Sequence, residues 1–451
     1  MAQYPKPTFL SDMTRNVQFR LDGITFTSDL EQYSQNVIRW KKNAVYLKGY
    51  EYNQLILRHP KKFINGVAPS GPSNSYLEKL LTGLVFQNGD THKEHRSAML
   101  PHFARRSVEK YFDTMVEVTN EVFDSFDHGY QGPLKDALTN LTFEIIFRTL
   151  FGTKTDSSDH NLAVNVVDWL QLLTNPLSFL SSGYYFPLLS KSASLYKETQ
   201  SVINQIQQRE DNPGILATLM KHTDMSNDDL IGHVVLLFFA GYETTRSTLY
   251  WLMILLSIHP DKAKLAFEDV EDAFGNEPLS FSSLDKLKYL DWFIKEGMRL
   301  FPAVPNLERI AATNFEIDGE EFNEGTHITI SPYHTHRNAD IWDDPLLFSP
   351  ARWDGLKVEP YTYLPYSLGS RACIGEYFAT IEIKVILSIF LRRFSVSLLN
   401  DITMINREMR ATLYPKETIG FQLGKPNEWS NFSGEITGNF RDMIQLNQVN
   451  S

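Results

Sequence analysis

The chain has 451 residues, more than a single hydrophobic core usually contains, so either two lobes or one large fold around a buried group would fit its length. Hydrophobic residues make up 42% of it and include 30 Phe, enough for a large core and an apolar cavity. The formal net charge of −11 argues against a nucleic-acid-binding protein, because such proteins usually carry a basic surface.

Cysteine content and apolar runs indicate the compartment. A single cysteine excludes an intrachain disulfide and fits a reducing environment. Residues 1–19 contain no apolar run of the signal-peptide type, and the longest apolar run, 249–256, is too short to cross a bilayer. We therefore expect a soluble, cytoplasmic protein without a membrane span.

Helical patterns dominate the first half of the chain. A helix that carries His92 and Arg96 on one face is expected to begin at Asp90 or Thr91. Residues 44–49 predict a short strand. The other ranges that predict helices in this half are 28–41, 51–63, 107–127, 133–152 and 160–174.

A long helix is predicted from Ser226 to about residue 258. Ser226 and Asp229 form a capping-box pattern, and His259-Pro260 ends the helix. Such a helix is roughly 45–50 Å long, enough to cross a domain. It is apolar on nearly all sides through HVVLLFFAGY, so we expect it to be buried. The aromatic stretch before it, 172–189, is either a mobile lid or a core-facing connection.

The second half adds a β region. A helix is predicted over about 284–300, and strand-like patterns follow Pro305. The fold class is therefore mainly α with a smaller β region, at about 44–48 and 306–335. Residues 1–424 are expected to form one domain. Residues 425–451 are polar and Asn-rich and predict a flexible or surface-packed tail.

Cys373, the single cysteine, lies on a loop just before a helical run. A lone cysteine is usually a small buried hydrophobe, but backbone N–H groups and a helix N-terminus near a thiol favour the thiolate that binds metals. The spacing supports the metal ligand. The loop resembles the haem-ligand loop of the cytochrome P-450 family through Tyr366, Gly369, Arg371, Cys373 and Gly375.

Three further motifs resemble the same family. AGYETT at 240–245 resembles its oxygen-activation motif, EGMR at 296–299 its ExxR motif, and PARW at 350–353 its meander signature. All four motifs occur in the order and spacing of the family, over about residues 30–423. The resemblance implies the cytochrome P-450 fold, with haem b between a long central helix and the loop of Cys373, which is then the iron ligand.

The resemblance also implies residues that hold the haem. Arg371, His92, Arg96 and Arg309 match positions that bind its propionates, although each is otherwise an ordinary surface residue. Gly369 and Gly375 would allow the backbone to approach the porphyrin and free N–H groups for the sulfur. The family usually has Phe where this chain has Tyr366. Its aromatic packing survives, but the added hydroxyl needs a partner.

On the opposite side of the haem, Ala240 and Gly241 would leave room for dioxygen. Thr244 is expected to bond back to the Ala240 carbonyl and open the helix locally. Glu243 and Thr244 would then relay protons. An ion pair of Glu243 with Arg246 and plain helix packing of Thr244 are the alternatives.

Structural roles are implied for three more residues. Glu296 and Arg299 share a helix face and would tie Arg352 and the meander to the core. His336 is expected to be a structural or surface histidine.

The implied activity is that of a bacterial-type monooxygenase of secondary metabolism that hydroxylates or epoxidises an apolar or aromatic small molecule. The chain is expected to be a monomer. It contains no flavin or ferredoxin module, so electrons from NAD(P)H would arrive through a separate reductase and a ferredoxin or flavodoxin. Lys93, Arg105 and Arg106 would receive this acidic donor or form an ordinary solvated face.

Three other activities stay open at this point. They are oxidative coupling of aromatic rings, a peroxygenase driven by hydrogen peroxide, and a non-enzymatic haem sensor. Glu243 and Thr244 argue against the last two, because neither needs this proton relay.

Overall fold

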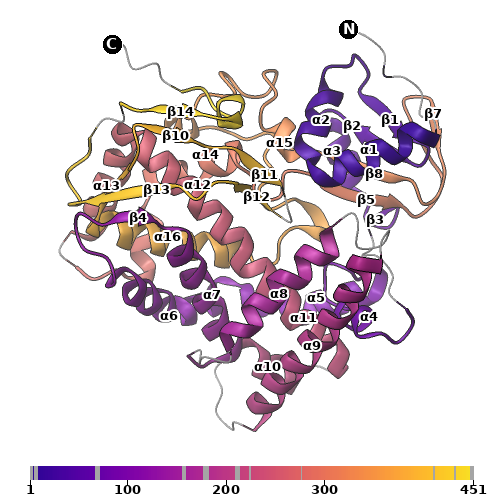
Figure 1. Cartoon of the computed structure of the whole chain (residues 1–451), viewed down its shortest axis with the longest axis horizontal. Helices are drawn as coiled ribbons and strands as arrows, with labels where there is room; N and C mark the ends of the chain where they lie inside the picture. Colours follow the sequence, from indigo (N-terminus) through magenta and orange to yellow (C-terminus); the bar gives the residue numbers. More distant parts are fainter. Residues whose placement is uncertain are drawn as a thin grey trace.

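Helices make up most of the molecule, and the strands gather at two places on one side of it (Figure 1). The computed structural model describes residues 4, 9–66, 72–154, 159–175, 182–208, 214–222, 225–275, 277–409, 412–430 and 433–446. The helices are α1 Phe9–Leu21, α2 Gly23–Glu31, α3 Tyr50–Arg58, α4 Tyr76–Leu80, α5 Gly89–Met99, α6 Arg105–Phe123, α7 Lys135–Phe151, α8 Asp159–Thr174, α9 Ser182–Gln207, α10 Ile215–His222, α11 Asn227–Phe238, α12 Thr244–Ile258, α13 Pro260–Phe274, α14 Tyr289–Leu300, α15 Pro332–Thr335 and α16 Glu376–Arg393.

One mixed sheet lies beside α1–α3 (Figure 1). Its strand order is β1 Val37–Lys41, β2 Ala44–Leu47, β8 His327–Ile330, β5 Leu307–Ala311 and β3 Phe63–Asn65. The pair β2–β8 is parallel, and the other pairs are antiparallel. The sheet therefore joins the first residues of the chain to the 307–330 region.

Short strands near the C-terminus form further sheets. A three-stranded sheet has the order β4 Gln131–Pro133, β13 Gly420–Gly424 and β9 Ser395–Leu398. The two-stranded pairs are β6 Phe315–Ile317 with β7 Glu320–Phe322, β10 Ile402–Met404 with β14 Glu435–Thr437, and β11 Arg407–Met409 with β12 Leu413–Pro415.

The fold class is confirmed as mainly α with a smaller β region, but two helix predictions were too long. In the range 28–41, α2 ends at Glu31 and residues 37–41 form β1, because pairing with β2 buries Val37 and Trp40. The helix predicted over 51–63 ends at Arg58, since Pro60 restricts the preceding residue. Strands also lie outside 44–48 and 306–335, at both ends of the chain.

The central helix follows the prediction closely. Ser226 and Asp229 form the capping box, with both reciprocal hydrogen bonds present. The helix continues from α11 through a π-helical stretch, Phe239–Glu243, into α12 and ends before Pro260. Its C-terminal half is buried on all sides, as expected from its apolar sequence.

The described part of the C-terminal segment packs onto the fold. Strand β14 pairs with β10, and Phe440 and Met443 are fully buried. The Phe440 ring stacks on Trp251 of α12 at 6.0 Å and on Phe301 at 5.6 Å. The packed chain thus extends beyond residue 424. Part of the 172–189 connection, residues 176–181, lies outside the described residues.

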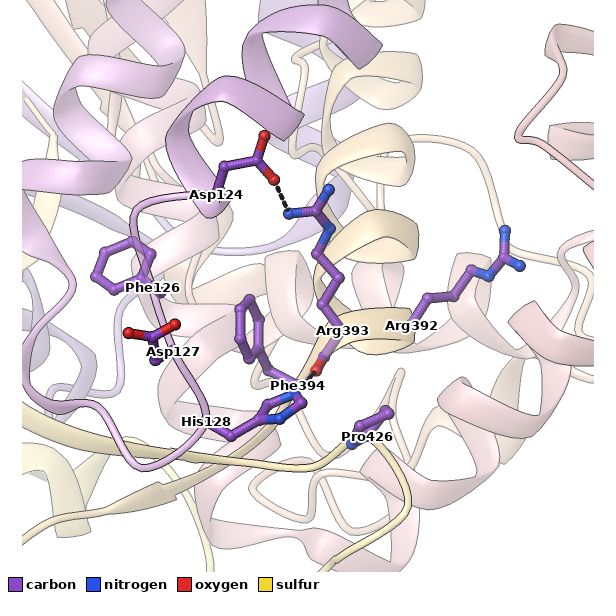
Figure 2. A pocket seen from close by; sticks show the side chains of 8 residues that line it. All are labelled: Asp124, Phe126, Asp127, His128, Arg392, Arg393, Phe394 and Pro426. Carbon is purple, nitrogen blue, oxygen red and sulfur yellow. Dashed lines mark hydrogen bonds and ion pairs between the residues drawn. The ribbon is translucent and has the colours of Figure 1, made fainter.

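A surface pocket of about 410 Å³ opens where α6 and α16 end (Figure 2). The Arg393 guanidinium pairs with Asp124 at 2.6 Å, and His128 Nε2 lies 3.0 Å from the Arg393 carbonyl oxygen. These wall groups bond to one another, so the pocket joins two helix ends without presenting a convergent set of unpaired polar groups.

Buried histidines predict a loss of stability in acid. Burial lowers the pKa of His233 to about 4 and that of His259, His334 and His336 to about 3. Each is therefore neutral in the folded protein, whereas the unfolded chain binds protons below pH 6.5. The free energy of unfolding is expected to fall by about 2 kcal/mol per histidine between pH 6.5 and 5. Urea unfolding at pH 6.5 and at pH 5 measures this change in the free energy of unfolding. Equal urea midpoints at the two pH values would contradict the prediction.

Candidate active site

The loop of Cys373 surrounds its thiol with protein on one side and leaves it accessible on the other. The Cys373 N–H donates to the Tyr366 carbonyl at 2.8 Å, and the residue is exposed. Burial raises the pKa of the thiol, and a hydrogen bond from the Gly375 backbone lowers it by less. The backbone alone therefore does not produce the thiolate. A positive centre bound to the sulfur would do so, which fits a metal ligand.

The two glycines of the loop have different roles. Gly369 has a φ of +79°, and a Cβ there would lie 2.7 Å from the carbonyl oxygen of Leu57 in α3. It therefore permits the turn and its contact with α3. Gly375 has an ordinary backbone conformation, and a Cβ there would lie 4.0 Å from the Cys373 sulfur.

Tyr366 finds a partner for its hydroxyl. The Tyr366 oxygen lies 3.3 Å from Thr380 Oγ1 of α16. The Thr380 hydroxyl donates to the Glu376 carbonyl at 2.8 Å, so Tyr366 donates to Thr380. The phenol O–H of Tyr366 is thus hydrogen-bonded to a residue of α16.

Four basic residues of the sequence prediction lie near one another. Arg371 donates to the Gln87 carbonyl at 2.7 Å. Burial, followed by the charge of Arg96, lowers the pKa of Arg371 to about 10. Arg309 is also buried, and burial followed by the charge of Arg371 lowers its pKa to about 10. Burial and the charges of Arg371 and Arg96 lower the pKa of His92 to about 4.

This cluster lacks compensating negative charge. In the ranges that the structure describes, no carboxylate forms an ion pair with Arg96, Arg309 or Arg371. Three guanidinium groups that repel one another in a partly buried place need anions. The cluster therefore fits a bound group that carries carboxylates.

The central helix opens where the sequence predicted. The Thr244 hydroxyl donates to the Ala240 carbonyl at 2.6 Å, within the π-helical stretch. Ala240 is exposed, whereas Leu237, Phe238 and Tyr242 beside it in the helix are buried. π-Helical stretches inside α-helices often occur at functional sites.

Gly241 packs closely against α7. A Cβ at this position would lie 2.8 Å from Ile146 Cγ1 and Cδ1 of α7. The glycine therefore lets the π-helical stretch lie directly against α7, a packing role that the sequence did not predict.

Replacing Gly241 with alanine is expected to destabilise the protein by about 1–3 kcal/mol, because a well-packed contact becomes overfilled. Urea unfolding measures the change. The double variant G241A/I146A should recover part of the loss, since it removes the side chain that the new methyl group meets. Equal stability of G241A and wild type would contradict the contact.

The comparisons with known proteins now decide the family. The model of the cytochrome P450 family matches residues 25–423. This chain belongs to the cytochrome P450 family.

The similar proteins align with most of this P450 chain. Cytochrome P450 4d1 of Drosophila simulans is 28% identical over 371 residues, which cover 71% of this chain and 72% of that relative. Human cytochrome P450 4V2 is 27% identical over 396 residues, with coverages of 78% and 75%. The structure of retinoic acid bound cyanobacterial CYP120A1 matches with a TM-score of 0.79 and 22% identity, over 91% of this chain and 96% of that one. This last match confirms the P450 fold.

Members of the cytochrome P450 family are haem-dependent monooxygenases. The residues present fit a haem, because an accessible thiol that needs a positive centre lies near guanidinium groups that need anions. Among the described residues, no helix combines the length and the hydropathy that crossing a membrane requires.

Glu243 of this P450 is held in an ion pair, the alternative that the sequence left open. Its carboxylate lies 2.7 Å from Arg246 Nη2, and Thr412 donates to it at 3.1 Å. The Arg246 guanidinium lies over the Tyr414 ring at 4.6 Å and donates to Thr139 at 3.2 Å. The sequence did not predict Thr412 and Tyr414 as neighbours, because they lie about 170 residues from Glu243 and Arg246 and belong to no motif.

Glu296 is fully buried at the centre of a cluster of paired side chains. It pairs with Arg299 at 2.9 Å and with Arg352 at 2.8 Å, and it accepts from the Trp353 indole at 3.0 Å. Arg299 also donates to the carbonyl of His336, whose two ring nitrogens bond to backbone groups. The cluster joins α14 to the meander, consistent with a structural role.

Proposed function

We propose that this P450 inserts one oxygen atom of dioxygen into an apolar or aromatic small molecule, with electrons from a separate ferredoxin- or flavodoxin-type donor. The opening of the central helix between Ala240 and Thr244 carries the proposal. A protein that only senses or stores a gas needs no such interruption beside a threonine and an acid, whereas oxygen cleavage needs protons delivered there.

The haem, when bound, supplies the chemistry of oxygen activation, and the thiolate of Cys373 favours O–O cleavage. Arg96, Arg309 and Arg371 would neutralise its propionates, and His92 would donate to one of them. The Tyr366 ring would pack beside the sulfur, because its backbone carbonyl is bonded to the Cys373 N–H.

Proton delivery would depend on Glu243 and Thr244. The Thr244 hydroxyl donates to Ala240, so its oxygen remains able to accept a hydrogen bond from a water or a substrate. The Glu243 carboxylate can turn toward a bound water or the substrate only when it leaves Arg246, because the ion pair and the Thr412 hydroxyl hold it in place. Arg246 would thus limit the rate of proton supply.

The electron donor would bind the face formed by α5 and the start of α6. Lys93 and Arg106 are exposed and form no ion pair within the described part of the chain, whereas Arg105 pairs with Asp285 at 2.6 Å. Leu100, which is 49% exposed, lies between them in sequence. An exposed apolar residue with flanking positive charges suits an acidic partner, and such binding weakens as salt screens the charges.

The test is reconstitution with NAD(P)H, a ferredoxin reductase and a ferredoxin, using compounds that shift the iron spin state. Under ¹⁸O₂, one labelled oxygen in the product supports the proposal. A coupled product without label indicates oxidative ring coupling instead. Turnover with hydrogen peroxide alone, and none with the electron chain, would establish a peroxygenase and contradict the proposal.

A further inference from the structure

The segment that precedes α5 lies directly against α11. The Thr82 hydroxyl donates to the Asp228 carbonyl at 2.9 Å. Two glycines let the backbones touch, since a Cβ on Gly83 would lie 2.7 Å from the Gly232 carbonyl oxygen. This contact places the end of the segment, residues 87–88, beside the histidines of α5 and α11.

Gln87, His95 and His233 form a hydrogen-bonded group between α5 and α11. Gln87 Nε2 lies 2.6 Å from the Thr82 carbonyl oxygen and 2.7 Å from His95 Nδ1. His233 Nε2 lies 3.0 Å from the same His95 nitrogen. His95 is 7% exposed and His233 1%, so solvent does not replace these bonds.

The pattern of donors assigns the tautomers. Gln87 uses one amide hydrogen on Thr82 and the other on His95, so His95 accepts at Nδ1 and carries its proton on Nε2. His233 Nε2 lies 3.0 Å from the same nitrogen, whose single lone pair Gln87 and His233 would share. His95 Nδ1 is thus held between these two side chains, and an apolar ring at either histidine would remove a buried polar contact.

A chain of hydrogen bonds continues from this group to the basic cluster. The backbone carbonyl of Gln87 accepts from Arg371 Nη1 at 2.7 Å, and the side-chain oxygen of Asn88 accepts from Arg371 Nη2 at 2.6 Å. These two contacts hold the Arg371 guanidinium against the repulsion of Arg96. The position of the Arg371 guanidinium thus depends on the position of residues 87–88.

We propose that Gln87, His95 and His233 are positioning residues that hold Arg371 toward a haem propionate. The proposal rests on the proposed function. The three side chains act through the backbone of residue 87, because that carbonyl bonds directly to the arginine. Substitutions in this group are expected to weaken haem retention.

The experiment measures haem transfer from the holoenzyme to excess apomyoglobin, together with the thermal unfolding midpoint. His233→Phe and His95→Phe each remove a buried hydrogen bond, and haem release is expected to be about three- to tenfold faster than in wild type. His233→Gln keeps a donor near the same place and should restore the rate. His259→Phe is the matched control, because His259 is also buried and neutral but stacks on Phe348 at 5.0 Å, outside this group.

The outcomes separate this proposal from the proposed function. Fast release in H233F and H95F, with near wild-type release in H233Q and H259F, supports the positioning group. Wild-type release in H233F overturns it and leaves the haem enzyme standing. Fast release in H233Q or in H259F also overturns it, because the effect would then reflect general loss of packing. A wild-type protein that takes up no haem would overturn both.

Discussion

Replacing Cys373 with serine is expected to abolish substrate oxidation and the red-shifted absorption band of the ferrous carbon monoxide complex. The thiolate sulfur supplies the electron density on which both depend, and a serine hydroxyl at the same place does not ionise near neutral pH. The absorption spectrum of the reduced protein under carbon monoxide measures the first effect, and product formation in the reconstituted system measures the second.

Ser370→Ala is the matched control, because Ser370 is an exposed residue of the same loop. It should keep both the spectrum and the activity. The unfolding midpoint of haem-free C373S should stay near that of wild type, since Cys373 is exposed. A shifted band that persists in C373S would show that another residue binds the iron.

Replacing Glu243 with glutamine is expected to lower the turnover number by about 100-fold or more, the usual range for loss of a general acid–base group. Glutamine keeps the volume and the acceptor for Thr412 but does not transfer protons. Haem content and the carbon monoxide spectrum should not change, because the Glu243 carboxylate bonds to Arg246 and Thr412, neither of which belongs to the loop of Cys373. Turnover at saturating substrate and electron donor measures the effect.

Two further variants separate proton transfer from the ion pair. Thr412→Val removes one hydrogen bond to Glu243 but leaves its charge, so turnover should fall by less than about tenfold. Urea unfolding of E243Q reports the cost of removing the charged partner of Arg246, about 1–3 kcal/mol for a partly buried pair. Lost stability with wild-type turnover would mean that Glu243 serves only to neutralise Arg246.

Several parts of the fold and site were predictable because their causes are local. The capping box at Ser226 and Asp229 and the bond from Thr244 to Ala240 each join residues within one turn of helix. The compact loop around Cys373 was predictable for a related reason, since its glycines and Arg371 lie within a few residues of the sulfur; its role as haem ligand stays a prediction.

Other roles were not predictable because the deciding partner lies far away in the chain. The sequence did not show that Ile146 of α7 lies against Gly241. The hydroxyl of Tyr366 has a partner only because α16 brings Thr380 beside the loop. Pairing with β2 likewise turned residues 37–41 from predicted helix to strand.

The sequence by itself indicated the family and the opening of the central helix and predicted Cys373 as the iron ligand, since motif spacing and helix periodicity act over a few residues. Only the tertiary structure decided the charge balance. It paired Glu243 with Arg246 beneath Tyr414, left Arg96, Arg309 and Arg371 without an ion-paired carboxylate among the described residues, and joined His95 to His233. The physical reason is that burial and charge depend on every neighbour in space, and most of those neighbours come from distant parts of the chain.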